Sequence, residues 1–277
     1  MAVTMLQSTS RESLTEAERS LDRLVESRTA DELSALGHEL YAVLRILDDE
    51  RSLLRYVGDV TVPAESRTAF ARQLFGQKLG ARTQEVLESL VAARWSRPSD
   101  LLVALEAMAR RALLGVAELR GELDEVEDEF FRFGRILDRE PRLNSLLTDT
   151  GADPEKRVEL LHGLLDGKVR QATAMLLTEA VRSPRGRALD LAATDLAELA
   201  AARRERYVAH VRTAVALTQA QEERLAETLT RMYERQMSLQ VELEPDLVGG
   251  LVIEVGGELI DGSVSGRMAA AQRQLPS

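Results

Sequence analysis

The sequence predicts a mainly helical fold in which two consecutive six-helix bundles share one long helix and a small α/β domain follows. Three observations predict this fold. The 277 residues are rich in helix formers and only 4% aromatic. The helical part repeats itself at an offset of 90 residues, and the hydrophobic period changes from 3.6 to 2 after Arg206. We therefore expect a first bundle over residues 1–107, a second over 108–205 and an α/β domain over 206–277.

The internal repeat needs no gaps. Residues 32–107 laid on residues 122–197 share 21 identities in 76 positions, whereas about 6 are expected by chance for so biased a composition. Residues 45–48 and 135–138 both read Arg-Ile-Leu-Asp, and the match continues through the loops. Two unrelated amphipathic segments also align in part, but not in one register through helices and loops. The repeat indicates a duplicated helical domain.

Each copy is expected to contain several short helices. Asp31 can cap the first helix of the matched region, because apolar residues follow it at spacings of three and four. Pro63 and Pro154 suit the first turns of two equivalent helices. A long helix opens at Ser99 and Asp100. At an offset of 90 it is both the last helix of the first copy and the first helix of the second, so we expect the bundles to share it.

The C-terminal region has the alternation of β-strands. Apolar residues alternate with others over 211–217, 239–243 and 251–255, which predicts three strands. Thr218 can cap a helix between the first two, and Gly256-Gly257 can turn the third strand into a hairpin with residues 258–260. Ser263 can cap a final helix. These elements form a small α/β unit.

The residues argue against several classes of function. The net charge of −10 opposes a primary role in nucleic-acid binding, and the absence of cysteine fits a reducing compartment. The three histidines, His38, His162 and His210, lack metal-ligand spacing, and the Gly pairs match no nucleotide-binding fingerprint. No apolar run approaches a membrane span. We therefore predict a cytoplasmic interaction protein with no catalytic, cofactor-binding or metal-binding residues.

The C-terminal region resembles one family. Residues 211–221 are similar to its "SA-x-PLT-x-x-Q" segment, and residues 244–256 to its motif of an acidic residue and Pro, an apolar-Gly-Gly and alternating apolar residues up to a Gly. An apolar-Asp-x-Ser-x-x-x-Arg pattern follows. The family is the delta subunit of F-type ATP synthases, called the oligomycin-sensitivity-conferring protein in mitochondria. The chain departs from the pattern at Ala216, where Pro is usual, at Gly257, where Asp or Asn is common, and in its second bundle.

The resemblance implies a non-catalytic stator subunit of the proton-translocating enzyme. Such a subunit joins the catalytic alpha/beta head to the membrane-anchored b subunit and resists rotary torque during ATP synthesis. Its bundle binds an N-terminal helix of an alpha subunit, and its C-terminal domain binds the end of b. The implied location is peripheral, on the cytoplasmic face of the bacterial plasma membrane, with no nucleic acid or small-molecule substrate as partner.

The candidate residues for the b contact are those of the family motif and its surroundings. They are Pro245, Leu247, Gly249, Gly250, Leu251, Ile253, Gly256, Ile260, Asp261, Ser263, Val264, Arg267 and Met268. Plain core packing is the alternative role for the apolar members. At the level of the whole chain, the alternatives are a helical adaptor unrelated to ATP synthase and a hydrolase or transferase with an unrecognised site.

Overall fold

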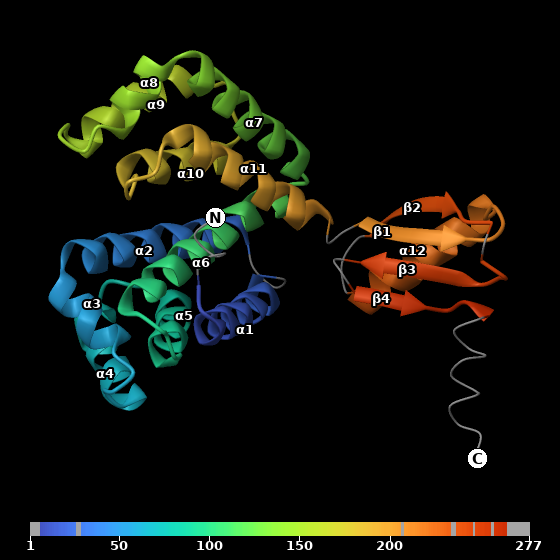
Figure 1. The fold of residues 1–277 in the computed structure, drawn as a ribbon, viewed down its shortest axis with the longest axis horizontal. Helices are drawn as coiled ribbons and strands as arrows, with labels where there is room; N and C mark the ends of the chain where they lie inside the picture. Colours follow the sequence, from blue (N-terminus) through green and yellow to red (C-terminus); the bar gives the residue numbers. More distant parts are fainter. Residues whose placement is uncertain are drawn as a thin grey trace. The chain divides into compact units, whose positions relative to one another are not determined.

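The computed structural model describes residues 6–25, 29–205, 208–233, 237–245, 247–255 and 258–264. In these ranges the chain forms twelve helices and four strands (Figure 1). It divides into two compact units, Met1–Ala197 and Glu198–Ser277. The prediction of a mainly helical protein with a small C-terminal sheet is confirmed.

The helices that precede the sheet follow the repeat closely. Their bounds are α1 Ser8–Val25, α2 Ala30–Asp49, α3 Arg51–Gly58, α4 Ala64–Phe75, α5 Ala81–Ala92, α6 Pro98–Leu119, α7 Leu123–Arg139, α8 Pro141–Thr148, α9 Pro154–Leu165, α10 Gln171–Arg182 and α11 Leu189–Glu205. The helices α3, α4 and α5 begin and end 90 residues before α8, α9 and α10. The internal similarity of the sequence is therefore a similarity of secondary structure.

Local chemistry explains where these helices start. The cap of α2 is Thr29, two residues before the predicted Asp31. Thr29 and Glu32 form a reciprocal capping box, which satisfies two backbone N–H groups at once. Asp153 caps α9 by accepting the N–H of Glu155, with Pro154 in the first turn as predicted.

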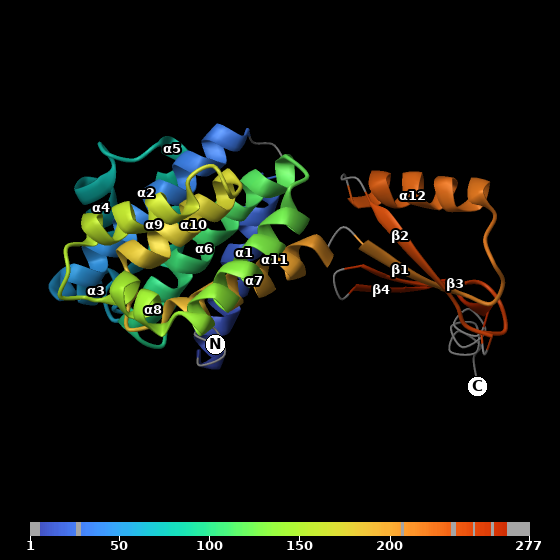
Figure 2. The ribbon, with the colours of Figure 1, turned by 90° about the horizontal axis from the view of Figure 1, so that it is seen from above.

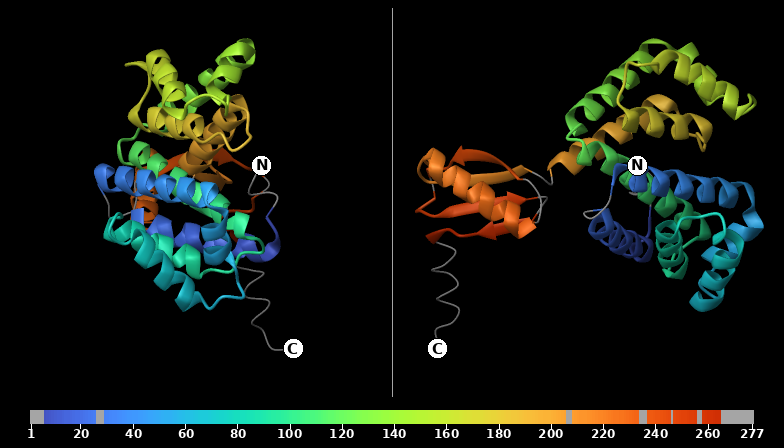
Figure 3. Two further views of the ribbon diagram at one scale, coloured as in Figure 1. Left: turned by 90° about the vertical axis from the view of Figure 1, so that its left-hand side faces the viewer. Right: turned by 180° about the vertical axis from the view of Figure 1, so that it is seen from behind.

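The long helix α6 lies at the centre of the first unit. It packs against α1, α2, α3 and α5, and also against α7 and α10 (Figures 1 and 3). Gly37 of α2 permits the closest approach, because an added Cβ would lie 2.5 Å from Leu113 and 3.2 Å from the carbonyl oxygen of Ala109. The side chains of α6 that are fully enclosed include Leu101, Leu105 and Met108. Burying each of them contributes about 1.5–3 kcal/mol.

Two buried arginines at equivalent positions each join segments of their own repeat. The Arg67 guanidinium is buried and donates to five backbone carbonyls, among them that of Ala92, 3.3 Å away. Arg157 is the same residue 90 positions later, and it donates to the carbonyl oxygens of Asp149 at 3.0 Å and Arg182 at 3.3 Å. Since residue 182 is the equivalent of residue 92, one contact occurs in both copies.

Two glutamates cap equivalent helices in the same way. Glu39 accepts the backbone N–H of Gly80 at 2.9 Å, and Glu129 accepts that of Arg170 at 2.9 Å. In each copy the carboxylate of the second helix thus satisfies an N–H that the start of a later helix leaves without a partner.

The C-terminal unit is a four-stranded sheet covered on one face by a helix (Figure 2). The elements are β1 Val208–Thr213, α12 Gln219–Tyr233, β2 Ser238–Leu243, β3 Leu251–Val255 and β4 Glu258–Asp261, and the strand order is β2-β1-β3-β4. The pair β1–β2 is parallel and the other two pairs are antiparallel. The core lies between sheet and helix and includes Ala209, Val211, Leu229, Ile253 and Val255.

The first strand differs from the prediction of 211–217. It ends at Thr213, whose hydroxyl donates to the carbonyl of Val215 at 3.0 Å and so turns the chain. The start of the predicted final helix at Ser263 is described, but its body lies outside the described residues, as does the predicted Gly256-Gly257 turn.

Candidate functional site

The family motif lies mainly at one end of the sheet. Because β1 and β2 are parallel, both finish at this end, and β3 starts there opposite them. Thr213 at the end of β1 is paired with both Leu243 and Leu251. Asp261, which ends β4, lies at the same end because it is paired with Val252. We call the loops and strand ends formed by residues 213–217, 243–245, 247–251 and 261–264 the motif end.

The glycines of the motif permit close contact between two loops. Gly250 has a φ of 88°, and an added Cβ would lie 2.5 Å from the carbonyl oxygen of Gly262 and 2.8 Å from the Cα of Ser263. The Val264 N–H donates to the carbonyl of Gly249 at 2.9 Å, which joins the two segments. Only glycine fits this approach, so the Gly-Gly pair has a geometric role.

Asp261 and Ser263 form a turn directly after β4. The Ser263 N–H donates to Oδ1 of Asp261 at 2.9 Å, and Ser263 is buried. Hydrogen bonds from the Ser263 hydroxyl and backbone N–H hold the pKa of Asp261 below its usual value. The Asp-x-Ser part of the motif therefore fixes the loop that covers Gly250.

The remaining motif residues occupy different environments. Ile253 is buried in the core, and Leu251 and Ile260 pack beside it on the face that α12 covers. Pro245 is exposed and Leu247 half-buried. The candidates Gly256, Arg267 and Met268 lie outside the described residues.

Sequence reasoning missed three exposed aliphatic side chains at the motif end. Val215 is 70% exposed, Leu243 57% and Val248 80%. The strand alternation had assigned Val215 to a buried face, whereas it lies beyond the end of β1. The sequence did contain one signal of an exposed apolar surface. Val248 is an aliphatic residue that lies between Pro245 and the two glycines of the motif.

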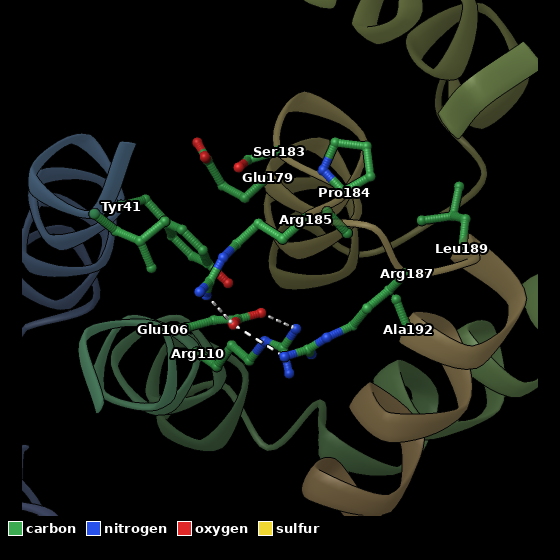
Figure 4. Close-up of a pocket in the computed structure, with 12 residues that line it drawn as sticks. Tyr41, Glu106, Arg110, Glu179, Ser183, Pro184, Arg185, Arg187, Leu189 and Ala192 are labelled. Atoms are coloured by element: carbon green, nitrogen blue, oxygen red, sulfur yellow. Dashed lines mark hydrogen bonds and ion pairs between the residues drawn. The ribbon is translucent and has the colours of Figure 1, made fainter. Parts of the chain in front are cut away.

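A second cluster of polar residues lies inside the helical unit. Glu106 of α6 pairs with Arg110, with Arg185 at 2.9 Å and with Arg187 at 3.4 Å (Figure 4). Tyr41 also lines this pocket, and burial raises its pKa to about 12. The Glu106 carboxylate is matched by guanidinium groups from three sides, so the cluster joins helices rather than presenting a free acid or base.

The histidines also have local partners. His162 lies 3.0 Å from the hydroxyl of Thr178, and His210 lies 3.0 Å from Glu205. His38 lies 3.7 Å from Glu179. Across the described ranges, no three His, Asp or Glu side chains are grouped so that they could hold a metal ion.

None of the helices that the structure describes is long and apolar enough to cross a membrane. A helical unit, together with a small sheet unit that exposes aliphatic side chains at its motif end, is typical of proteins that bind other proteins. A family model described as ATP synthase delta (OSCP) subunit matches residues 109–275, and the chain belongs to this family. It is thus a non-catalytic stator subunit of an ATP synthase, as the resemblance implied.

Relatives match almost the whole chain. The ATP synthase subunit delta of Thermobifida fusca (strain YX) is 43% identical over 98% of this chain and 99% of its own length. The ATP synthase subunit delta of Streptomyces avermitilis is 42% identical over 97% of this chain and 98% of its own length. The ATP synthase subunit b-delta of Mycobacterium sp. (strain KMS) is 44% identical over 98% of this chain, which spans 61% of that longer relative. Both helical copies therefore have counterparts in related chains.

Proposed function

We propose that this chain joins the catalytic alpha/beta head of the ATP synthase to the b subunit, with the motif end as the b contact. The observation that carries the proposal is the group of exposed Val215, Leu243 and Val248 beside the family motif. Exposed aliphatic side chains at one end of a sheet favour binding of an apolar partner surface, such as one face of a helix. The Mycobacterium relative is named b-delta, which supports a close association between b and this fold.

The helical unit would hold the head through an N-terminal helix of an alpha subunit. We propose the domain limits 1–107, 108–205 and 206–277, with α6 shared by the first two. Support comes from the contacts of α6 with α1, α2, α3 and α5 of the first bundle and with α7 and α10 of the second. A shared helix would leave no flexible linker between the bundles, as resistance to torque requires.

The proposed location is the cytoplasmic face of the bacterial plasma membrane, reached through b. The chain itself would contact neither lipid nor nucleic acid and would bind no cofactor. The family assignment supports this location, because a delta subunit belongs to a membrane-bound ATP synthase. A helical adaptor unrelated to ATP synthase is not favoured by the relatives.

The b contact can be tested with the purified full chain and the soluble part of b. Leu243→Asp combined with Val248→Asp is expected to raise the Kd at least about tenfold, since charges would enter an apolar contact. Leu259→Asp is the matched control, because Leu259 is 58% exposed but lies two residues from the motif end on β4. Calorimetry measures both variants. Equal Kd values for all proteins would place the b contact elsewhere.

The stator role is tested in membrane vesicles. Removal of this chain is expected to abolish proton-driven ATP synthesis, and its return to restore it. Vesicles that remain fully coupled without the chain would contradict the role.

A further inference from the structure

The helix α7 exposes three side chains whose counterparts on α2, 90 residues earlier, are buried or half-buried. Tyr41 on α2 is 5% exposed, whereas Phe131, 90 residues later on α7, is 57% exposed. Arg45 and Asp48 of α2 are matched on α7 by Arg135 and Asp138, which are the same residue types. Both of the latter side chains are exposed. On α2 Tyr41 is buried and Arg45 and Asp48 are half-buried, whereas all three equivalents on α7 are exposed.

Within the first unit, the pattern on α2 binds the C-terminal end of α10 and the loop after it. Arg45 forms an ion pair with the buried Glu179, and Asp48 lies 3.4 Å from the guanidinium of Arg185. Tyr41 lines the pocket formed with Pro184 (Figure 4). An aromatic ring, a cation and an anion on α2 thus contact the C-terminal end of α10 and the loop that follows it.

On α7 the same three residues have no such partner in the described ranges. The Arg135 guanidinium lies over the Phe131 ring at 5.8 Å, and Arg135 and Asp138 make no ion pair there. The neighbouring turn of α11 packs on Gly134 through Asp190, Ala193 and Thr194. We call Phe131, Arg135 and Asp138 the α7 face.

We propose that the α7 face binds the C-terminal end of an α-helix from another subunit of the ATP synthase. That helix end would present a carboxylate to Arg135 and, about six residues later, a guanidinium to Asp138. Glu179 and Arg185 have this spacing where they meet Arg45 and Asp48. The inference rests on the proposed function only in taking the partner from the same complex.

A second copy of this chain does not supply that chemistry. In the first repeat, the residues equivalent to Glu179 and Arg185 are Ser89 and Trp95, which carry no charge. The chain's own Glu179 and Arg185 are engaged by α2. Repeats that stack in one direction leave a terminal face for a different partner, and here the charges select against another copy of the same chain.

The contact can be tested by photo-crosslinking in the assembled enzyme. The full chain with Phe131→p-benzoylphenylalanine is incorporated into the complex and irradiated. We expect a crosslink to one other subunit, at a helix end that carries Glu and Arg about six residues apart. Tyr41→p-benzoylphenylalanine is the matched control, and it is expected to crosslink within the chain near Pro184.

A charge exchange makes the test specific. Arg135→Glu is expected to reduce the crosslink at least about tenfold, and an Arg in place of the partner's Glu is expected to restore it. Arg132→Glu makes the same charge change at another exposed arginine of α7 and is the control. It is expected to leave the crosslink yield within about twofold. Hydrogen exchange of the α7 amides, which needs no photoreactive residue, is expected to slow when the complex forms.

Two results would overturn the inference. One is an enzyme that assembles and stays coupled while position 131 gives no crosslink and α7 exchange does not change. The other is a crosslink to a second copy of this chain. A chain that fails to enter the enzyme at all would contradict the proposed function instead.

Discussion

In the first helical repeat the Arg67 guanidinium donates to the carbonyl of Ala92, and in the second Arg157 donates to the carbonyl of Arg182. Tyr41 and Phe131 are also equivalent in sequence, yet the first is enclosed and the second is exposed. The positions that satisfy buried backbone groups have kept both residue and contact across the duplication. The positions on helix faces have kept their pattern while their surroundings changed.

The two arginines also differ in how fully they are bound. Arg67 donates to five carbonyl oxygens, and one of these five bonds runs from its Nε to the carbonyl of Val62 at 3.2 Å. Arg157 donates to two, and its buried Nε has no hydrogen-bond partner among the described residues. The comparison predicts that the first repeat depends more on its arginine than the second.

The largest expected effect comes from removing these arginines. Arg67→Ala is expected to lower the free energy of unfolding by about 3 kcal/mol, and Arg157→Ala by about 2 kcal/mol, because buried carbonyls lose their donor. Urea unfolding of the full chain, followed by far-ultraviolet circular dichroism, measures both. The control Arg51→Ala, at an exposed position of α3, is expected to stay within about 0.5 kcal/mol of the unaltered chain. A larger loss for Arg157→Ala would reverse the comparison.

A smaller effect is expected from the two glycines at helix crossings. Gly37→Ala is expected to cost about 2 kcal/mol, since its Cβ would meet the enclosed Leu113 at 2.5 Å. Gly134→Ala is expected to be neutral or to stabilise by up to about 1 kcal/mol, because its nearest neighbours lie 3.7 Å away and Ala favours helix.

Thermal unfolding followed by calorimetry separates the two glycine variants. Equal melting temperatures of the two variants would show that α2 and α6 can move apart without loss of stability. The close approach at Gly37 would then not distinguish the two helix crossings.

The smallest effect is on the pH dependence of stability. Burial raises the pKa of Tyr41 to about 12, whereas an unfolded tyrosine titrates near 10. Between these pH values the unfolded chain releases a proton that the folded chain keeps. The contribution of Tyr41 to the free energy of unfolding is therefore complete below pH 10. It decreases as the pH rises towards 12, by about 1 kcal/mol at pH 11.

Tyr41→Phe is expected to remove this part of the alkaline loss, as measured by urea unfolding at pH 9 and pH 11. Phe131→Tyr is the matched variant, and its exposed phenol is expected to titrate near pH 10. The change in the free energy of unfolding between pH 9 and pH 11 is then expected to equal that of the unaltered chain. If Tyr41→Phe and the unaltered chain lose the same free energy of unfolding between pH 9 and pH 11, the Tyr41 ring is not enclosed in solution.

Periodicity and the repeat predicted most of the helical architecture, because both depend on neighbours close in sequence. The errors have local physical causes. Thr29 replaced Asp31 as the cap of α2, since it can exchange two hydrogen bonds with Glu32. The strand expected to reach residue 217 ended at Thr213, although Leu217 still packs against the core from the loop.

The candidate site was predictable as a stretch of sequence but not as a surface. The approach of Gly250 to Gly262 requires that β3 and β4 pair first. The exposure of Val215, Leu243 and Val248 depends on where three separate segments end. The opposite environments of Tyr41 and Phe131 were also hidden, because they follow from the packing of one repeat on the next.

The strand β1 is the first strand of the C-terminal unit, and it lies between β2 and β3 and is hydrogen-bonded to both. If b is held at the Thr213 end of that strand, a load applied at its Val208 end acts along the strand axis. Such a load falls on two ladders of hydrogen bonds in parallel, instead of opening one ladder bond by bond. An edge strand in the same place would share this load with only one ladder, so the strand order suits a part that carries tension.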